Sequence, residues 1–413
     1  MVLNINVVIL HLPKKQNYIL MTRKLFVPGI TLLGMAVTNI AQAQVYKEVG
    51  PISYAVPFLT IAPDARSGAM GDVGVALSPD AYSQHYNVGK MAMNEDEAGI
   101  AVSYSPWLKD IVPDVALLYA SGFYKFGENK EQAISGSIRY FNLGEINYRD
   151  ENNQDLGIGK PNELAIDLGY SRKLSENLSL GASIRYINSN IAAGVKNTGS
   201  SSGYKPANTA AADIGLFYTK TTMTSEEQGS TINFGAALRN LGGRVTYSQL
   251  QRDFLPAQLA VGASYTYHID KFNKFTASVD LVKLLVPAAE RVIEQNGDTS
   301  YVQPRDMSVV SGALSSFTKA PGMYGTTLGI GAEYWYQDQF ALRAGYFHED
   351  KQLGNRQYFA VGIGLRYSMF GIDASYLVPS GSSIARNPLS NTLRFSLLFN
   401  FNNKKYFKDK EDA

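Results

Sequence analysis

The stretch Asn391–Phe401, with the sequence NTLRFSLLFNF, alternates between two kinds of side chain. One set of alternate positions is apolar and consists of Leu393, Phe395, Leu397, Phe399 and Phe401. The positions between them are mostly polar and include Arg394. Because successive side chains of a β-strand point to opposite faces, the stretch predicts a strand with one apolar and one mostly polar face. Such a strand is typical of an outer-membrane β-barrel whose apolar face meets lipid.

The same alternation recurs along most of the chain before this stretch. Segments near residues 134–140, 178–186 and 259–268 each combine an apolar face, often ending in Tyr, with a polar face. Together with the closing stretch they give about 14 strands, and single-chain bacterial barrels have an even number. Tyrosines at the ends of apolar faces match the aromatic girdles of a membrane protein. The sequence therefore predicts an all-β fold, a transmembrane antiparallel β-barrel over residues 97–401.

Charged residues determine which face of each predicted strand points inward. They fall on the polar faces, and the set consists of Arg139, Asp167, Arg185, Asp213, Arg239, Asp280, Glu333, Arg343, Arg366, Asp373 and Arg394. An arginine that faces lipid near the bilayer midplane costs about 2–4 kcal/mol. We therefore expect these residues to line the lumen, where arginines and carboxylates can form ion pairs.

The predicted connections alternate between short and long. The short ones include Gly127–Lys130, Ser175–Asn177, Asp270–Asn273 and Gln337–Gln339, and the long ones include Leu143–Lys160, Ser189–Ala207, Leu241–Leu255, Lys283–Gly325 and Pro379–Ser390. Bacterial barrels have short periplasmic turns and longer outer loops. A soluble β-sandwich or propeller has no reason to sort its loops in this way. We expect the protein in the bacterial outer membrane, with both termini in the periplasm.

Composition restricts the class of protein. The 413 residues include no Cys, which excludes disulfides, cysteine-ligated metals and thiol catalysis. No apolar run of about 18 residues follows residue 43, so membrane-spanning helices are not expected. The formal net charge is +2, and without the four basic residues of the segment 1–43 the total of 38 falls to 34, against 36 acidic residues. Nucleic-acid binders usually show a basic excess, so we expect no nucleic-acid partner, and we also expect no metal and no cofactor.

The two ends of the chain lie outside the predicted barrel. Residues 21–43 combine a basic start, an apolar run and the small-residue site Ala41–Ala43, which is the pattern of a signal peptide cleaved after Ala43. We interpret residues 1–20 as an upstream extension from a start codon assigned too early. Residues 402–413 are charged and polar, and we expect them to form a frayed periplasmic tail.

Residues 44–96 lack the alternation of the barrel strands. They contain APDARSGAMGDVGVA at Ala62–Ala76, SPDA at Ser78–Ala81 and QHYN at Gln84–Asn87. Together with the barrel pattern, these runs resemble the PorV family of outer-membrane barrels of the type IX secretion system and, more distantly, the FadL family of transport barrels. The sequence departs from the family after Asn87, where Val88 stands in place of the usual proline.

The resemblance implies a 14-stranded barrel in which residues 44–96 form a plug in the lumen. The implied partners are outer-membrane lipid, the C-terminal signal domains of secreted cargo, a translocon and a sortase-containing attachment complex that receives the cargo. Such a protein is a shuttle and not an enzyme. The residues that suit a packed plug are Arg66, Gly68, Gly71, Asp72, Gly74 and Asn87, since glycines permit close backbone approach and the charges can pair with the lumen. A local surface turn is the alternative, and the glycine spacing disfavours a phosphate-binding loop.

The predicted loop Lys283–Gly325 has about 40 residues, and loops of this length are usually functional or disordered. Its segment Ala288–Gln295 fits a short helix, and its apolar residues suit docking onto a partner. Disorder and packing over the barrel mouth are the alternatives. The residues expected at a partner contact are Tyr301, Val302, Met307 and Phe317, with Trp107 of the first outer loop, for which an interfacial anchor is the simpler explanation.

Two other functions remain alternatives to the shuttle. An esterase related to lipid A deacylation needs a nucleophile, a base and an orienting group in one place. His268 and His348 are predicted at opposite ends of the barrel and His85 in the plug, so no such site is expected. A FadL-like channel for hydrophobic molecules needs an apolar path, whereas the predicted inner face is rich in Arg, Asp, Ser and Gly.

Overall fold

The computed structural model describes residues 50–107, 114–149, 152–191, 193, 205–248, 251–293, 298–304, 307–318, 324–350, 353–380 and 392–401. The predicted upstream extension 1–20, the signal peptide 21–43 and the tail 402–413 lie outside the described residues. The described chain is dominated by β-structure with a few short helices. None of its helices is long and apolar enough to cross a membrane.

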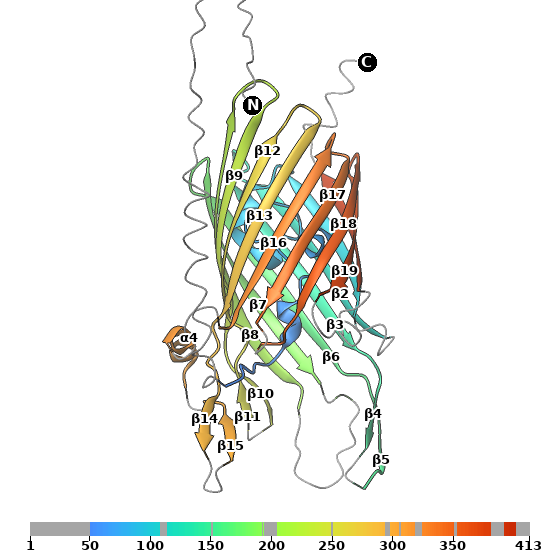
Figure 1. Cartoon of the computed structure of the whole chain (residues 1–413), viewed down its shortest axis with the longest axis vertical. Helices are drawn as coiled ribbons and strands as arrows, with labels where there is room; N and C mark the ends of the chain where they lie inside the picture. The colour runs from blue at the N-terminus through green and yellow to red at the C-terminus, as the bar shows by residue number, and fades with distance from the viewer. Residues whose placement is uncertain are drawn as a thin grey trace, which may run out of the picture. The chain divides into compact units, whose positions relative to one another are not determined.

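Fourteen antiparallel strands form one closed barrel (Figure 1). In chain order they are β1 Ala98–Pro106, β2 Val115–Phe126, β3 Gln132–Leu143, β6 Asn162–Lys173, β7 Leu178–Asn190, β8 Ala207–Met223, β9 Gly229–Gly242, β12 Gln258–His268, β13 Asn273–Leu284, β16 Thr326–Tyr336, β17 Phe340–Glu349, β18 Gln357–Tyr367, β19 Phe370–Pro379 and β20 Leu393–Phe401. Each barrel strand pairs with the next barrel strand along the chain. The last strand, β20, closes the barrel against β1, with Ala98 opposite Phe401. The predicted barrel of about 14 strands is confirmed.

The two faces of the wall differ as the alternation indicates. On β20, Phe395 is 47% exposed on the outer face, whereas the neighbouring Arg394 is 1% exposed. The same contrast holds on β7 between Ile184 and Arg185. Apolar side chains on the outside and buried charges on the inside are the arrangement that a lipid-facing barrel requires, because a charge turned outward would lie in hydrocarbon.

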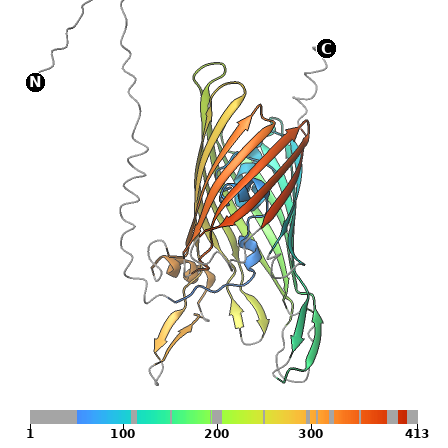
Figure 2. The ribbon, with the colours of Figure 1, turned by 45° about the vertical axis from the view of Figure 1, so that its right-hand side comes forward.

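A plug formed by residues from Gly50 to about Asp96 fills the lumen. It contains four short helical elements, η2 (Pro57–Thr60), α2 (Ala65–Ala69), α3 (Ser83–Tyr86) and η3 (Val88–Met93), and Figure 2 shows helical turns of this segment inside the barrel. Such short helices leave many backbone carbonyls without an internal donor. Serine hydroxyls of the wall bind one such carbonyl and three in the segments between the helices at 2.6–2.8 Å, in the pairs Ser179 to Gly89, Ser103 to Pro63, Ser121 to Ala81 and Ser264 to Ala76.

The connections are sorted between the two mouths of the barrel. One mouth has tight turns, and the other has longer loops with three hairpins, β4–β5 (Ile146–Arg149 and Asp155–Gly159), β10–β11 (Val245–Ser248 and Gln251–Asp253) and β14–β15 (Glu290–Ile293 and Thr299–Val302) (Figure 1). Helix α4 (Val309–Thr318) belongs to the same loop as β14–β15. The short helix expected at Ala288–Gln295 is wrong, because Glu290–Ile293 pairs with Thr299–Val302 as a strand.

The plug runs through the lumen from one mouth to the other. At its start, the Tyr324 hydroxyl donates to the Gly50 carbonyl, and Ala289 N donates to the Pro51 carbonyl at 3.1 Å, so this end lies at the long-loop mouth. At its end, Lys125 Nζ donates to the Asn94 carbonyl at 2.5 Å, near the tight turn after β2. The described chain therefore begins at the long-loop mouth and ends with Phe401 at the short-turn mouth. The expectation that both termini lie in the periplasm concerns residues outside the described ranges and stays a prediction.

Candidate functional site

Arg66 joins the plug to the barrel wall. It lies in α2, whose N-terminus is capped by Asp64 through a bond from Ser67 N to Oδ2 at 2.8 Å. The buried guanidinium donates to both carboxylate oxygens of Glu333 on β16, at 3.1 and 2.9 Å, and to Asp80 of the plug at 2.9 Å. Paired bonds of this kind are stronger and more directional than a single charged contact.

Behind Arg66, a chain of ion pairs continues around the wall. Arg343 donates to Glu333 at 2.6 Å and to Asp373 at 2.8 Å, and Arg366 donates to Asp373 at 2.7 Å. Both arginines lie 5.3 Å from the ring centroid of Trp335, a geometry that favours a cation over an aromatic face. Trp335 was absent from the residues expected from the sequence, because the strand pattern alone does not show which ring lies between two cations.

Asp72 forms the second ionic link between plug and wall. Its Oδ1 accepts from Arg394 Nη1 at 2.8 Å, and its Oδ2 accepts from the Tyr358 hydroxyl. The residue has φ of 60°, a left-handed conformation in which Asp is one of the less costly non-glycine residues. Arg394 and Asp72 therefore lie in one contact, as the expected pairing of plug and lumen charges requires.

Glycines on both sides of the plug–wall interface permit direct backbone contact. A Cβ on plug Gly68 would lie 2.1 Å from Arg394 Nη1, and Gly71 has φ of +73° against the Tyr346 carbonyl. The wall shows the same adaptation, since a Cβ on Gly345 would lie 2.1 Å from the Met70 carbonyl carbon, and one on Gly215 would lie 2.1 Å from Asn87 Oδ1. The sequence analysis did not identify these wall glycines, although glycine at inward strand positions was the available signal.

The middle of the plug is held by Asp280 and Asn87. Asp280 Oδ2 on β13 accepts from Gly74 N at 2.6 Å and from Val75 N at 2.8 Å. Asn87 Nδ2 donates to the Val75 carbonyl and to the Leu216 carbonyl on β8, and its Oδ1 caps η3 by accepting from Gly89 N at 3.0 Å. Asn87 thus holds the plug to itself and to the wall without the proline that usually follows it in the family it resembles.

The remaining expected lumen charges lie together on the opposite arc of the barrel. Arg185 pairs with Asp167 at 2.5 Å and with Asp213 at 2.8 Å. Arg139 donates to the Phe58 and Leu59 carbonyls and contacts His85 Nδ1. Arg239 is buried beside them, and its Nε has no hydrogen-bond partner among the described residues.

Ionisable groups of the plug are strongly influenced by their burial. Burial, followed by the nearby charge of Asp80, raises the pKa of Asp64 to about 6. Burial lowers the pKa of Lys90 to about 8, and its Nζ donates to the Gly74 carbonyl at 2.8 Å. Burial and then the charge of Arg139 lower the pKa of His85 well below its ordinary value. Charged forms of these groups are therefore disfavoured inside the lumen.

The long-loop mouth exposes large apolar side chains. In the loop between β13 and β16, Tyr301 and Val302 of β15 and Phe317 of α4 are each about half exposed, at 46%, 48% and 50%. Val310 and Leu314 of α4 are more exposed still. Met307 lies at the base of this loop, where its carbonyl accepts from Arg244. Trp107 is partly buried against the cluster formed by the start of the plug, so it packs over the mouth instead of projecting from it.

The described residues do not assemble a catalytic or metal site of the kinds considered above. They contain no group of three or more His, Cys, Asp or Glu side chains placed to hold a metal ion. His268 contacts Thr231 near the short-turn mouth, His348 lies on β17 near the long-loop mouth, and His85 lies in the plug. The described histidines are thus separated, and the most distinctive features of the described chain are the plug–wall interface and the apolar mouth.

Comparison with known proteins identifies a family. Residues 44–291 match the profile of the family described as type IX secretion system protein PorV. No curated protein sequence matches the chain. Among solved structures, the toluene transporter TbuX of Ralstonia pickettii is 13% identical with a TM-score of 0.45, over 82% of this chain and 98% of that one. A Pseudomonas aeruginosa FadL homologue is 12% identical with a TM-score of 0.41, over 85% of this chain and 100% of that one.

Proposed function

The chain belongs to the PorV family of type IX secretion system proteins of the outer membrane, and from this premise we propose that it is a cargo shuttle. In this function it binds the C-terminal signal domain of secreted proteins at the translocon and delivers them to a cell-surface attachment complex that contains a sortase-like protease. The long-loop mouth faces the cell exterior, where both the released cargo and the attachment complex are found.

The observation that carries this proposal is the exposed apolar surface at the long-loop mouth. We define the mouth surface as Ile293, Tyr301, Val302, Val310, Leu314 and Phe317. These side chains lie beyond the barrel strands, on β14, β15 and α4, so the lipid that covers the outer wall does not explain their exposure. An apolar surface of several large side chains is typical of a site that another protein covers.

The filled lumen favours a carrier, which binds cargo at its surface, over a channel, which passes molecules through its interior. Arg66, Asp72, Asn87 and the wall serines fasten the plug along its length. A cavity of about 60 Å³ on the long-loop side and one of about 500 Å³ at the short-turn mouth share no lining residue. A FadL-like channel for hydrophobic molecules would require the plug to leave this network.

The test is capture of purified cargo signal domains by the detergent-solubilised protein. Leu314→Asp and Phe317→Asp are expected to reduce the affinity at least tenfold, because each places a charge in the proposed contact. Ile158→Asp is the matched control, since Ile158 is 59% exposed on the separate β4–β5 hairpin, and it should bind as the unmodified protein does.

Failure of the unmodified protein to bind any signal domain would overturn the shuttle. Equal binding by the α4 variants and the control would instead remove the mouth surface from the proposal. Uptake of a labelled fatty acid into liposomes that contain the protein would support the channel.

A further inference from the structure

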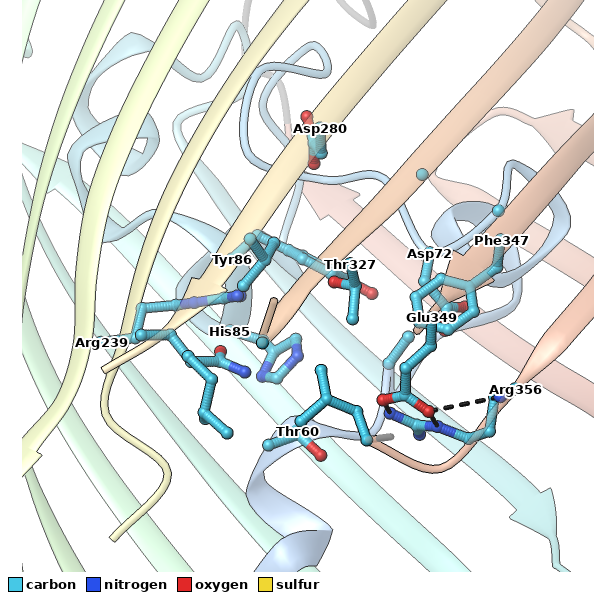
Figure 3. A pocket seen from close by; sticks show the side chains of 18 of the residues that line it. Thr60, Asp72, His85, Tyr86, Arg239, Asp280, Thr327, Phe347, Glu349 and Arg356 are labelled. Carbon is cyan, nitrogen blue, oxygen red and sulfur yellow. Dashed lines mark hydrogen bonds and ion pairs between the residues drawn. The ribbon is translucent and has the colours of Figure 1, made fainter. Parts of the chain in front are cut away.

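A small polar cavity separates the plug from the wall strands β9, β12, β13, β16 and β17. It has a volume of about 60 Å³, and Figure 3 shows His85 and Tyr86 of the plug with Arg239 of the wall around it. A buried water needs roughly 10–15 Å³ of such space. The cavity therefore has room for a small ion with a few waters, but none for an acyl chain or a peptide.

Arg239 lines this cavity and forms no close ion pair within the described part of the chain. Its side chain is 92% buried, since its exposed fraction is 8%, and its Nε has no hydrogen-bond acceptor within the described part of the chain. The carboxylates that influence it most are Asp213, which binds Arg185, and Asp280, whose Oδ2 binds the backbone of Gly74 and Val75. A buried charged donor without an acceptor carries a desolvation cost.

Gln258 and His85 add further donors to the same cavity. Gln258 lies directly opposite Arg239 in the register of β12 and β9 and lines the same cavity. His85 Nδ1 contacts the guanidinium of Arg139, and because a guanidinium only donates, Nδ1 must accept. The ring proton of neutral His85 is therefore on Nε2, and His85 lines the cavity.

The acceptors around the cavity are nearly all satisfied. Asp72 is bound by Arg394 and Tyr358, and both oxygens of Glu349 are bound by Arg356 at 2.7 and 2.6 Å (Figure 3). Asp280 Oδ1 is the buried acceptor that remains unpaired among the described lining residues. Among the buried lining atoms without a partner, Arg239 Nε is the donor, and positive charge from Arg139, Arg185 and Arg239 acts on His85.

We propose that this cavity binds one small inorganic anion of the size of chloride, which accepts hydrogen bonds from Arg239, Gln258 and His85 Nε2. Two of these ligands belong to the wall and one to the plug, so the bound anion fastens the plug to β9 and β12. Plug retention then depends on halide as well as on the ion pairs of Arg66 and Asp72. Waters that link Arg239 to Asp280 Oδ1 are the competing occupant.

The test uses the full mature protein in detergent, with bromide as the probe. Crystals soaked in bromide should show an anomalous peak within hydrogen-bond distance of Arg239 and His85. Titration with bromide or chloride at constant ionic strength, balanced with gluconate, should raise the unfolding temperature in a saturable way, since a ligand that binds only the folded state stabilises it.

Arg239→Gln should weaken halide binding at least tenfold in the titration, and Gln258→Leu provides the same test if the first variant does not fold. Arg366→Gln is the matched control, because Arg366 faces the lumen near the short-turn mouth and is bound by Asp373, and it should retain the halide response. No bromide peak at the cavity, a peak that appears only at crystal-soak concentrations without a response in solution, or an unchanged response in Arg239→Gln would each overturn the proposal.

Discussion

Arg66→Met should lower the free energy of unfolding by about 3 kcal/mol. Removal of one partner from a buried ion pair costs about 3–5 kcal/mol, mainly because the other charge is left uncompensated. Here Glu333 loses the two bonds from Arg66 at 3.1 and 2.9 Å but keeps Arg343 at 2.6 Å. Asp80 is partly exposed, with 15% of its side chain accessible, and can recover water. The loss is therefore expected at the lower end of that range.

Unfolding by urea in detergent or vesicles, followed by tryptophan fluorescence, measures this loss. Trp335 lies against Arg343 and Arg366 and so reports on the same network. The matched control is Arg172→Met, which breaks a surface pair with Glu131 at 3.1 Å whose side chains are 55% and 37% exposed. An exposed pair contributes less than about 1 kcal/mol, so the control should unfold almost as the unmodified protein does.

The double variant Arg66→Met/Glu333→Gln separates pairing from packing. If the two residues act as a pair, its loss is smaller than the sum of the two single losses, by roughly 1–3 kcal/mol. Additive losses in the double variant, or a loss for Arg66→Met no larger than that of Arg172→Met, would refute the view that this ion pair holds the plug.

Three further expectations address pH, packing and sidedness. Burial raises the pKa of Asp64 from an ordinary 3.8 to about 6. The protonated form therefore contributes stability below about pH 4, and this contribution is lost as the pH rises through 6. The unfolding free energy of the unmodified protein minus that of Asp64→Asn should fall over this interval and be constant above it. Gly215→Ala should reduce folding yield and expose the plug to protease because its Cβ would meet Asn87, while Gly243→Ala, with its nearest atom at 3.4 Å, should behave normally; equal protease resistance would contradict this. Because the chain has no natural cysteine, a membrane-impermeant maleimide should label Ser53→Cys on intact cells and Glu128→Cys only after lysis, and the reverse pattern would invert the proposed orientation.

The sequence by itself determined the wall of the barrel. Alternation with a period of two is a local property of a strand, so the inward direction of Arg185 and Arg394 followed from their immediate neighbours once the cost of a lipid-facing charge was considered. The strand count and the sorting of short and long connections followed from the same pattern. Helix α4 was missed, and a helix was expected instead at Ala288–Gln295. In this loop the segments pair with one another, and the sequence lacks the period-two alternation that identified the barrel strands.

Tertiary structure alone decided what each inward charge contacts. Arg66 and Glu333 are 267 positions apart in sequence, and their pairing depends on closure of the barrel and on the depth at which the plug sits in it. The same closure leaves Arg239 Nε without an acceptor among the described residues, while Arg185 pairs with two carboxylates. The period of a strand fixes the face on which a charge lies, but the position of a partner across a closed lumen is set by long-range register, which no local pattern contains.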